Sequence, residues 1–96
     1  MWDGYKTPRW RRLREKILRR DGYMSVEARR YGKAVPANTV HHVRPAEDFP
    51  ELAWAPWNLI SITTEEHALM HNADGSLTEL GRAWVKRTHP PRRPAP

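Results

Sequence analysis

The sequence contains no cysteine in its 96 residues. Disulfide bonds and thiolate metal sites are therefore excluded, and a bound metal ion must use histidine, carboxylate or water ligands. No run of apolar residues approaches the length of about 18 that a membrane span requires, and the N-terminus lacks the apolar region of a signal peptide. We therefore expect a cytoplasmic protein with no membrane partner.

Acidic residues are scarce, with 11 Asp and Glu against 17 Lys and Arg, and the formal net charge is +6. This surplus favours a polyanionic partner, nucleic acid above all. Excess arginine can equally form a solvated face, so the charge alone leaves both interpretations open. A chain of this length allows one small domain with a modest core, to which the five tryptophans can contribute large buried surfaces.

The histidines are concentrated in one stretch, because four of the five lie between Thr39 and His71. They form two close pairs, His41-His42 and His67-x-x-x-His71. Two histidines four residues apart on a helix point the same way, with about 5–6 Å between their Cβ atoms, so both can bind one metal ion. Alone, this pair leaves coincidence open, but with the first pair nearby it predicts a metal site. A zinc protease is a poor alternative, because no glutamate directly follows His67.

The N-terminal part is predicted to be helical at first and irregular later. Residues 1–6 form a short lead. Thr7 and Pro8 supply a capping hydroxyl and a first-turn proline, so a helix should run from them to about Arg20. Its apolar residues recur at helical spacing and basic residues fill most other positions, which predicts one packed face and one cationic face. Residues 23–30 are predicted to hold little regular structure.

Two strands are predicted in the middle of the chain. Residues 39–43 include a β-branched run and form the strand that carries the paired histidines, and residues 58–62 form the second strand. Prolines interrupt residues 44–57, which predicts a long loop with one short helical turn at most. Loops of this length are usually functional or disordered, and the apolar residues in this one indicate packed order.

Two capping boxes predict the last two helices. Residues 63–66 have the hydroxyl-x-x-glutamate form, which predicts a helix running to His71 or Asn72. Residues 76–79 repeat the form and should open a last helix that ends near Thr88. Residues 89–96 are rich in proline and arginine and hold too little apolar surface to fold, so they are predicted to be a flexible tail.

The order of these features resembles the HNH endonuclease family: a strand with two histidines, a loop, an asparagine, a strand, and a helix with His-x-x-x-His. Residues 10–23 look like the helix that precedes the motif in phage-type and bacterial HNH proteins. Residues 58–62 look like the family's Asn-Leu segment, nine residues before the final motif histidine, here His67. The resemblance implies an α+β fold in one domain of residues 1–88, with a ββα-metal core at 39–72, an N-terminal helix and a C-terminal helix.

The resemblance also implies a role for each residue of the motif. His42 would be the general base, and a histidine pKa near 6.5 suits that task at neutral pH. His41 and His67 would hold one divalent metal ion (Mg, Mn, Ni or Zn), with His71 as a third ligand. Asn58 would bond across the hairpin and hold the base-bearing strand in position.

The activity implied is that of a metal-dependent HNH endonuclease that hydrolyses phosphodiester bonds in DNA and leaves 5′-phosphate and 3′-hydroxyl ends. The alternative is a non-catalytic nucleic-acid-binding module with the same fold. Small family members often belong to phages and work beside DNA-packaging machinery. Oligomeric state, target sequence and choice of metal stay open. The arginines expected to contact nucleic acid are Arg9, Arg11, Arg12, Arg19 and Arg44.

A departure from the family concerns its structural zinc. Many relatives carry two Cys-x-x-Cys pairs, and the aligned positions here hold Ser25, Ala28, Thr63 and Glu66. These cannot replace four thiolates, so we expect no structural zinc. Capping boxes and tryptophans should supply part of the lost support.

The paired histidines raise a geometric problem, because neighbouring residues on a strand point to opposite faces of the sheet. If His42 serves the same phosphate as the metal, the strand must end, bend or twist at this point. The assignment requires His42 to lie beside the concave spot shared by His41 and His67, and not to be buried against apolar neighbours.

Overall fold

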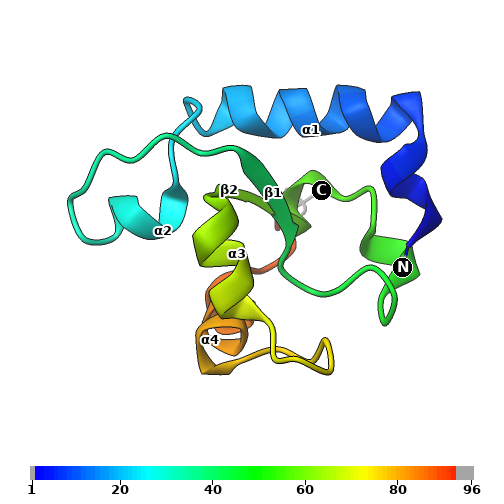
Figure 1. Cartoon of the computed structure of the whole chain (residues 1–96). Coiled ribbons are helices and arrows are strands. Elements are labelled where there is room, and N and C mark those ends of the chain that lie inside the picture. The colour runs from blue at the N-terminus through cyan, green and yellow to red at the C-terminus, as the bar shows by residue number, and fades with distance from the viewer. Residues whose placement is uncertain (1, 93–96) are drawn as a thin grey trace.

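A two-stranded antiparallel sheet lies at the centre of the molecule, with helices on both sides of it (Figure 1). The computed structural model describes residues 2–92; the last four residues of the predicted tail lie outside this range. Helix α1 crosses above the strands, and α4 packs below α3. The predicted α+β fold with its ββα core is confirmed. The main elements are α1 (Pro8–Arg20), α2 (Val26–Arg29), β1 (Thr39–His42), β2 (Leu59–Ile62), α3 (Thr64–Met70) and α4 (Glu79–Arg87).

The sheet separates two small apolar clusters. The register pairs His41 with Ile60 and His42 with Leu59. Because side chains alternate along a strand, Val40 and Leu59 face α1, while Ile60 and its neighbours face α3 and α4. The first cluster consists of Trp10, Ile17, Leu18, Val40 and Leu59; the second consists of Val43, Ile60, Ile62 and Met70, covered by Leu80, Trp84 and Val85.

Helix α1 has the predicted boundaries. The Thr7 hydroxyl accepts a hydrogen bond from the backbone N–H of Trp10, and Pro8 occupies the first turn. The lead before it is more ordered than the sequence predicted, because Asp3–Lys6 forms a 3-10 helix. Gly4 is required there, since a Cβ atom at this position would overlap the indole of Trp2. The N-terminal segment, residues 2–6, is therefore folded against the domain.

Two predictions for the irregular segments need correction. Residues 23–30 include helix α2, whose N-terminus is capped by the Ser25 hydroxyl. A helix of four residues is too short to show a periodic pattern in the sequence. The long loop holds two 3-10 helices, Pro50–Leu52 and Pro56–Asn58, where one helical turn was predicted. Proline at the first position of each starts the turn, since its φ angle is already suitable.

The ends of α3 and α4 also differ from the prediction. The capping box before α3 is present, but this helix ends at Met70, so His71 lies just beyond it in extended conformation. The capping box predicted at residues 76–79 is wrong. Ser76 donates its hydroxyl and its backbone N–H to Asp74, and Thr78 caps α4 instead. The turn between Asp74 and Ser76 passes through Gly75, whose φ of +89° suits glycine. Because the Ser76 hydroxyl bonds to Asp74, it is not available to cap α4.

The four positions aligned with the zinc ligands of relatives come together in one hydrogen-bond network. The Ser25 hydroxyl donates to a Glu66 carboxylate oxygen at 2.6 Å, and the same oxygen accepts the backbone N–H of Thr63 at 2.8 Å. The Thr63 hydroxyl accepts the Glu66 N–H, and the Ser25 hydroxyl accepts the N–H of Ala28. The network joins α2 to the start of α3.

Replacing Glu66 with alanine should destabilise the domain by about 2–3 kcal/mol, because the fully buried Ser25 hydroxyl and the Thr63 N–H lose their partner. For a domain of this size the melting temperature should fall by roughly 10–20 °C. The matched control is Glu65→Ala, an exposed glutamate in the same helical turn. Thermal melts followed by circular dichroism would measure both, and an equal effect of the two substitutions would refute the role of the network.

Candidate active site

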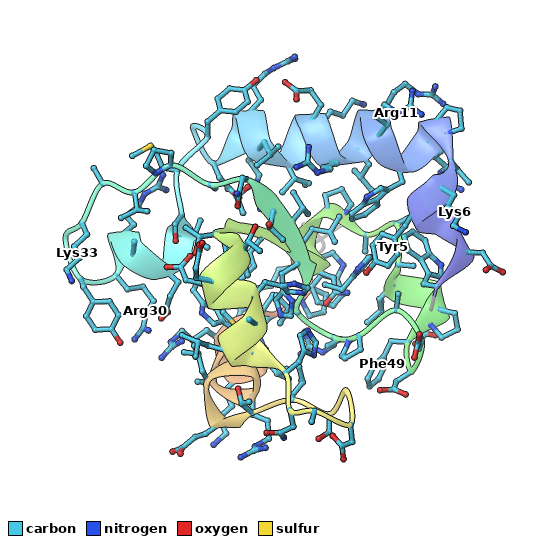
Figure 2. All side chains as sticks on the ribbon, in the orientation of Figure 1. Tyr5, Lys6, Arg11, Arg30, Lys33 and Phe49 are labelled. Atoms are coloured by element: carbon cyan, nitrogen blue, oxygen red, sulfur yellow. The ribbon has the colours of Figure 1, made fainter. Side chains whose placement is uncertain are left out.

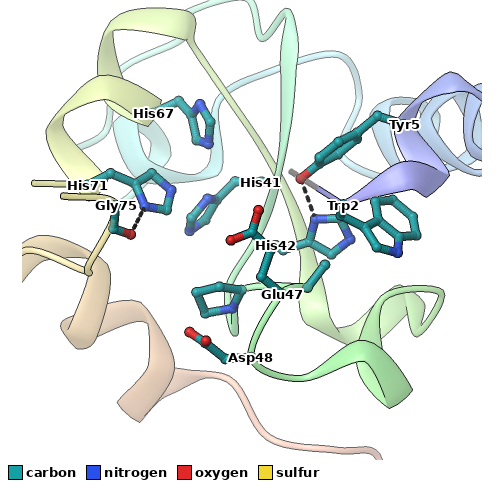
Figure 3. Close-up of a pocket in the computed structure, with 11 residues that line it drawn as sticks. Trp2, Tyr5, His41, His42, Glu47, Asp48, His67, His71 and Gly75 are labelled. Atoms are coloured by element: carbon teal, nitrogen blue, oxygen red, sulfur yellow. Dashed lines mark hydrogen bonds between the residues drawn. The ribbon is translucent and has the colours of Figure 1, made fainter. Parts of the chain in front are cut away.

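Three histidines from separate parts of the chain meet on one side of the sheet. His41 comes from β1, His67 from the middle of α3, and His71 from just after α3; we call them the histidine triad (Figure 3). One nitrogen from each lies within 4.8 Å of the others, and the ring centroids are 4.9–5.3 Å apart. Nε2 of His41 is buried and has no hydrogen-bond partner among the described residues. A buried nitrogen without a partner is costly, and a cation at the centre of the triad would satisfy it.

The electrostatics of the triad suit a metal site. Burial lowers the pKa of His41 from 6.5 to about 3, and repulsion from His67, His71 and His42 adds to the effect. Burial also lowers the pKa of His67, with His71 as the next cause. Neutral imidazoles keep the lone pair that a metal ion needs. Nδ1 of His71 must donate to the carbonyl of Gly75 at 3.3 Å, so its Nε2 is the nitrogen with a lone pair for an ion.

The strand places His41 and His42 on opposite faces, as the pleat requires. His41 points toward α3 and the triad, and His42 points toward α1 and the N-terminal segment. Both nevertheless line one cavity of about 470 Å³, because β1 ends at His42 and the cavity wraps around that end. Termination of the strand thus resolves the geometric problem. Figure 3 shows the triad on one side of this active-site cavity and His42 with Tyr5 on the other.

The His42 ring is held by two hydrogen bonds. Its Nε2 lies 2.9 Å from the carbonyl oxygen of Ala53, and its Nδ1 lies 3.0 Å from the Tyr5 hydroxyl. A carbonyl oxygen can only accept, so Nε2 carries the hydrogen and Nδ1 accepts from Tyr5. Burial lowers the pKa of His42, although the bond to Ala53 opposes this, so the ring is neutral at pH 7.

The His42 side chain is more buried than its proposed role as a base led us to expect from the sequence. The side chain is only 4% exposed, and its ring stacks on Trp10 at 5.1 Å and meets the edge of Trp2. The faces of the ring are therefore buried against aromatic neighbours. Both ring nitrogens have polar partners, however, and His42 still contributes to the wall of the cavity.

Asn58 is completely buried and bonds to the backbone that follows His42. Its Oδ1 accepts the N–H of Arg44 at 2.9 Å, and its Nδ2 donates to the carbonyls of Arg44 and Leu52. Its own carbonyl accepts the N–H of Val43. Asn58 thereby joins the end of β1 to the long loop, whose Ala53 carbonyl orients the His42 ring.

Sequence reasoning missed part of the cavity wall. Trp2 and Tyr5 line it, together with Glu47 and Asp48 from the loop after β1. The two acidic side chains belong to the same cavity wall as the triad and His42 (Figure 3). Nothing in the sequence links Tyr5 to a histidine 37 residues away.

The arginines predicted to contact nucleic acid do not form one surface. Arg9 and Arg12 share a groove of about 220 Å³ with Lys16, and Arg9 lies 4.0 Å above the ring of Trp54. Arg11 lies on the side of α1 away from the sheet (Figure 2). Arg9 and Arg11 therefore belong to the same helix but point in different directions.

The two remaining arginines have partners within the domain. Arg19 forms an exposed ion pair with Glu15 at 3.8 Å. Arg44 stacks on Trp57 at 5.3 Å and reaches the carbonyl of Val85. Its Nη1 is buried and has no partner among residues 2–92.

Acidification should destabilise the metal-free protein between pH 6.5 and about 3. In this range His41 is protonated in the unfolded state but stays neutral in the folded state. The folded state is therefore at its most stable above pH 6.5, the pKa of His41 in the unfolded chain, and loses stability as the pH falls toward the pKa of about 3 in the folded protein. The shift corresponds to an upper limit of roughly 5 kcal/mol. Urea melts at several pH values with a chelator present would measure it. His41→Gln should flatten the pH dependence, and an unchanged slope would contradict the prediction.

The fold and the site together define a ββα-metal, or HNH, fold. Among solved structures, the chain is similar to that of the HNH endonuclease from the deep-sea thermophilic bacteriophage GVE2, crystallised with a manganese ion. The TM-score is 0.65 and the identity 23%, over 86% of this chain and 78% of that one. No protein-family profile matches the sequence, and no curated protein matches it. In residues 2–92 every helix is too short or too polar to span a membrane.

Proposed function

We propose that this protein is a metal-dependent endonuclease that hydrolyses phosphodiester bonds in DNA. The observation that carries the proposal is the shared cavity. It is lined by the triad, in which Nε2 of His41 is buried without a partner among residues 2–92, and by His42, whose acceptor nitrogen Nδ1 lies on the Tyr5 hydroxyl. A metal site and a neutral base beside one concavity are the parts that phosphodiester hydrolysis needs. The shared fold with a phage HNH endonuclease agrees with this chemistry.

His42 is proposed to accept the proton of the water that attacks phosphorus. The bond from Nε2 to the Ala53 carbonyl selects the tautomer in which Nδ1 keeps its lone pair. Asn58 does no proton chemistry in this proposal. Its bonds to Arg44 and Leu52 keep the end of β1 and the Ala53 loop in register, and reactions that depend on orientation are sensitive to such support.

The histidine triad is proposed to hold one divalent ion. Three imidazole ligands, with the remaining coordination positions open to water, suit transition ions such as Mn, Ni and Zn. Mg is the fourth candidate. The manganese ion in the GVE2 endonuclease structure supports this assignment. Such an ion, when bound, would stabilise negative charge on the phosphate and on the departing 3′ oxygen.

DNA is proposed as the substrate because of the net charge of +6 and the basic groove on α1. Arg9, Arg12 and Lys16 are the cations placed to contact phosphates there, with Trp54 forming the floor under Arg9. Arg11 and Arg19 lie on the same helix and add to its positive potential. Association with DNA-packaging machinery stays a prediction.

The decisive experiment is incubation of the protein with supercoiled plasmid and Mg²⁺, Mn²⁺, Ni²⁺ or Zn²⁺ in turn. Nicked or linear DNA, with 5′-phosphate ends that a ligase can seal, is the expected result with at least one metal. DNA binding without cleavage in any of these metals would show the alternative, a nucleic-acid-binding module that keeps the fold.

A further inference from the structure

The acceptor nitrogen of His42 is already occupied in this structure. Nε2 donates to Ala53, and the single lone pair on Nδ1 receives the Tyr5 hydroxyl at 3.0 Å. No ring nitrogen of His42 is left for a direct bond to water. If His42 is the base of the proposed endonuclease, on which this inference rests, the proton must reach it through Tyr5 or Tyr5 must leave.

The N-terminal segment holds Tyr5 in place. The Gly4 carbonyl accepts both the N–H and the hydroxyl of Thr7, which ties the segment to the start of α1. Trp2 packs edge-on against Tyr5 at 4.8 Å and against Trp54 at the same distance. The Tyr5 ring also meets Trp10 at 5.2 Å. These contacts define a fixed position for the phenol and favour passage of the proton over departure of the side chain.

The Tyr5 hydroxyl has the right hydrogen-bonding capacity for this task. Tyr5 lines the active-site cavity and is 41% exposed, so water can approach its oxygen. A phenol that donates its hydrogen to Nδ1 still has lone pairs that accept a hydrogen bond from a water in the cavity. Burial and the charge of Glu47 raise the pKa of Tyr5 above its ordinary value, which keeps the phenol protonated at neutral pH.

We propose that Tyr5 is a catalytic residue that relays the proton from the attacking water to His42. As the water oxygen bonds to phosphorus, its proton moves to the Tyr5 oxygen and the phenolic proton moves to Nδ1 of His42. The bond between phosphorus and the 3′ oxygen breaks, and that oxygen takes a proton from solvent. Tyr5 is then again a neutral phenol and His42 an imidazolium, so one proton has to leave. The imidazolium passes its Nδ1 proton back to the Tyr5 oxygen as the phenol releases its own proton to solvent, and the site is restored.

The test is Tyr5→Phe, which removes the hydroxyl but keeps the ring that packs on Trp2 and Trp10. With the metal that supports cleavage, kcat should fall about 100-fold, while KM and the Kd for DNA change less than about twofold. Tyr31→Phe is the matched control, because Tyr31 is 66% exposed and is not among the residues that line the cavity. Its kcat should equal that of the wild type.

Two further measurements separate a relay from a structural role. In Tyr5→Phe combined with His42→Ala, activity should fall no lower than in His42→Ala alone, because one proton path is interrupted twice. A proton inventory in H₂O and D₂O mixtures should curve for the wild type, because two protons move together, and should become linear in Tyr5→Phe. If Tyr5→Phe does not fold, a linear inventory for the wild type would itself overturn the relay.

The possible failures are distinguishable. The relay would be overturned if Tyr5→Phe cleaved DNA as fast as the wild type, or faster, while His42→Ala was inactive. The proposed endonuclease activity would then still hold, and Tyr5 would only block access of water to Nδ1 of His42. A wild type that cleaves no DNA with any metal would overturn both proposals together.

Discussion

His42→Ala is expected to lower plasmid cleavage by about 10³-fold or more while DNA binding is retained. The substitution removes the group proposed to act as general base, and general-base catalysis typically contributes 10²–10⁴-fold. No phosphate contact is lost, since the basic groove lies on α1. Initial rates of nicking and the Kd for a labelled duplex would measure the two effects separately.

The control for this substitution is His89→Ala, which makes the same chemical change at an exposed histidine outside the site. His42→Ala also leaves the Ala53 carbonyl without its partner and opens space beside Trp2 and Trp10, so some loss of stability is expected. Rates are therefore compared well below the melting temperature of each variant. Nicking by folded His42→Ala at the rate of the wild type would refute the assignment.

Metal removal is expected to abolish cleavage without unfolding the domain. The histidines of the triad belong to neither of the two apolar clusters, and these clusters and the network of Ser25, Thr63 and Glu66 hold the elements together without a metal ion. A chelator should therefore reduce cleavage to background and leave the circular dichroism spectrum unchanged at 25 °C. Global unfolding on chelation would contradict this view.

His67→Ala should weaken metal binding by more than about 100-fold, because one of three ligands is lost and even outer-shell substitutions cost 10–100-fold. Metal at 100 times its Kd should stabilise the wild type by about 2.7 kcal/mol. The resulting rise in melting temperature should be absent in His67→Ala at the same metal concentration. Calorimetric titration would give both affinities, with His89→Ala as control. Equal metal affinity in His67→Ala and the wild type would exclude the triad as the site.

Local signals in the sequence predicted much of the fold. Thr7 and Pro8 set the start of α1, and the capping box of Thr63 and Glu66 set the start of α3, because caps act within one turn of a helix. The same locality explains the errors. Ser76 was predicted to cap α4, but its hydroxyl and backbone N–H bond to Asp74 two residues earlier. The sequence pattern does not show which of these two hydrogen-bonding arrangements forms.

Sequence alone determined which chemistry is available to this protein. With no cysteine, four clustered histidines and a net charge of +6, residue types and spacing predict a histidine metal site and favour a polyanionic partner. The tertiary structure alone decided how His42 is presented. The end of β1, the Ala53 carbonyl and the hydroxyl of Tyr5 set its tautomer and its access to water. These contacts join residues 11 and 37 positions apart, and packing across such distances leaves no periodic trace in the chain.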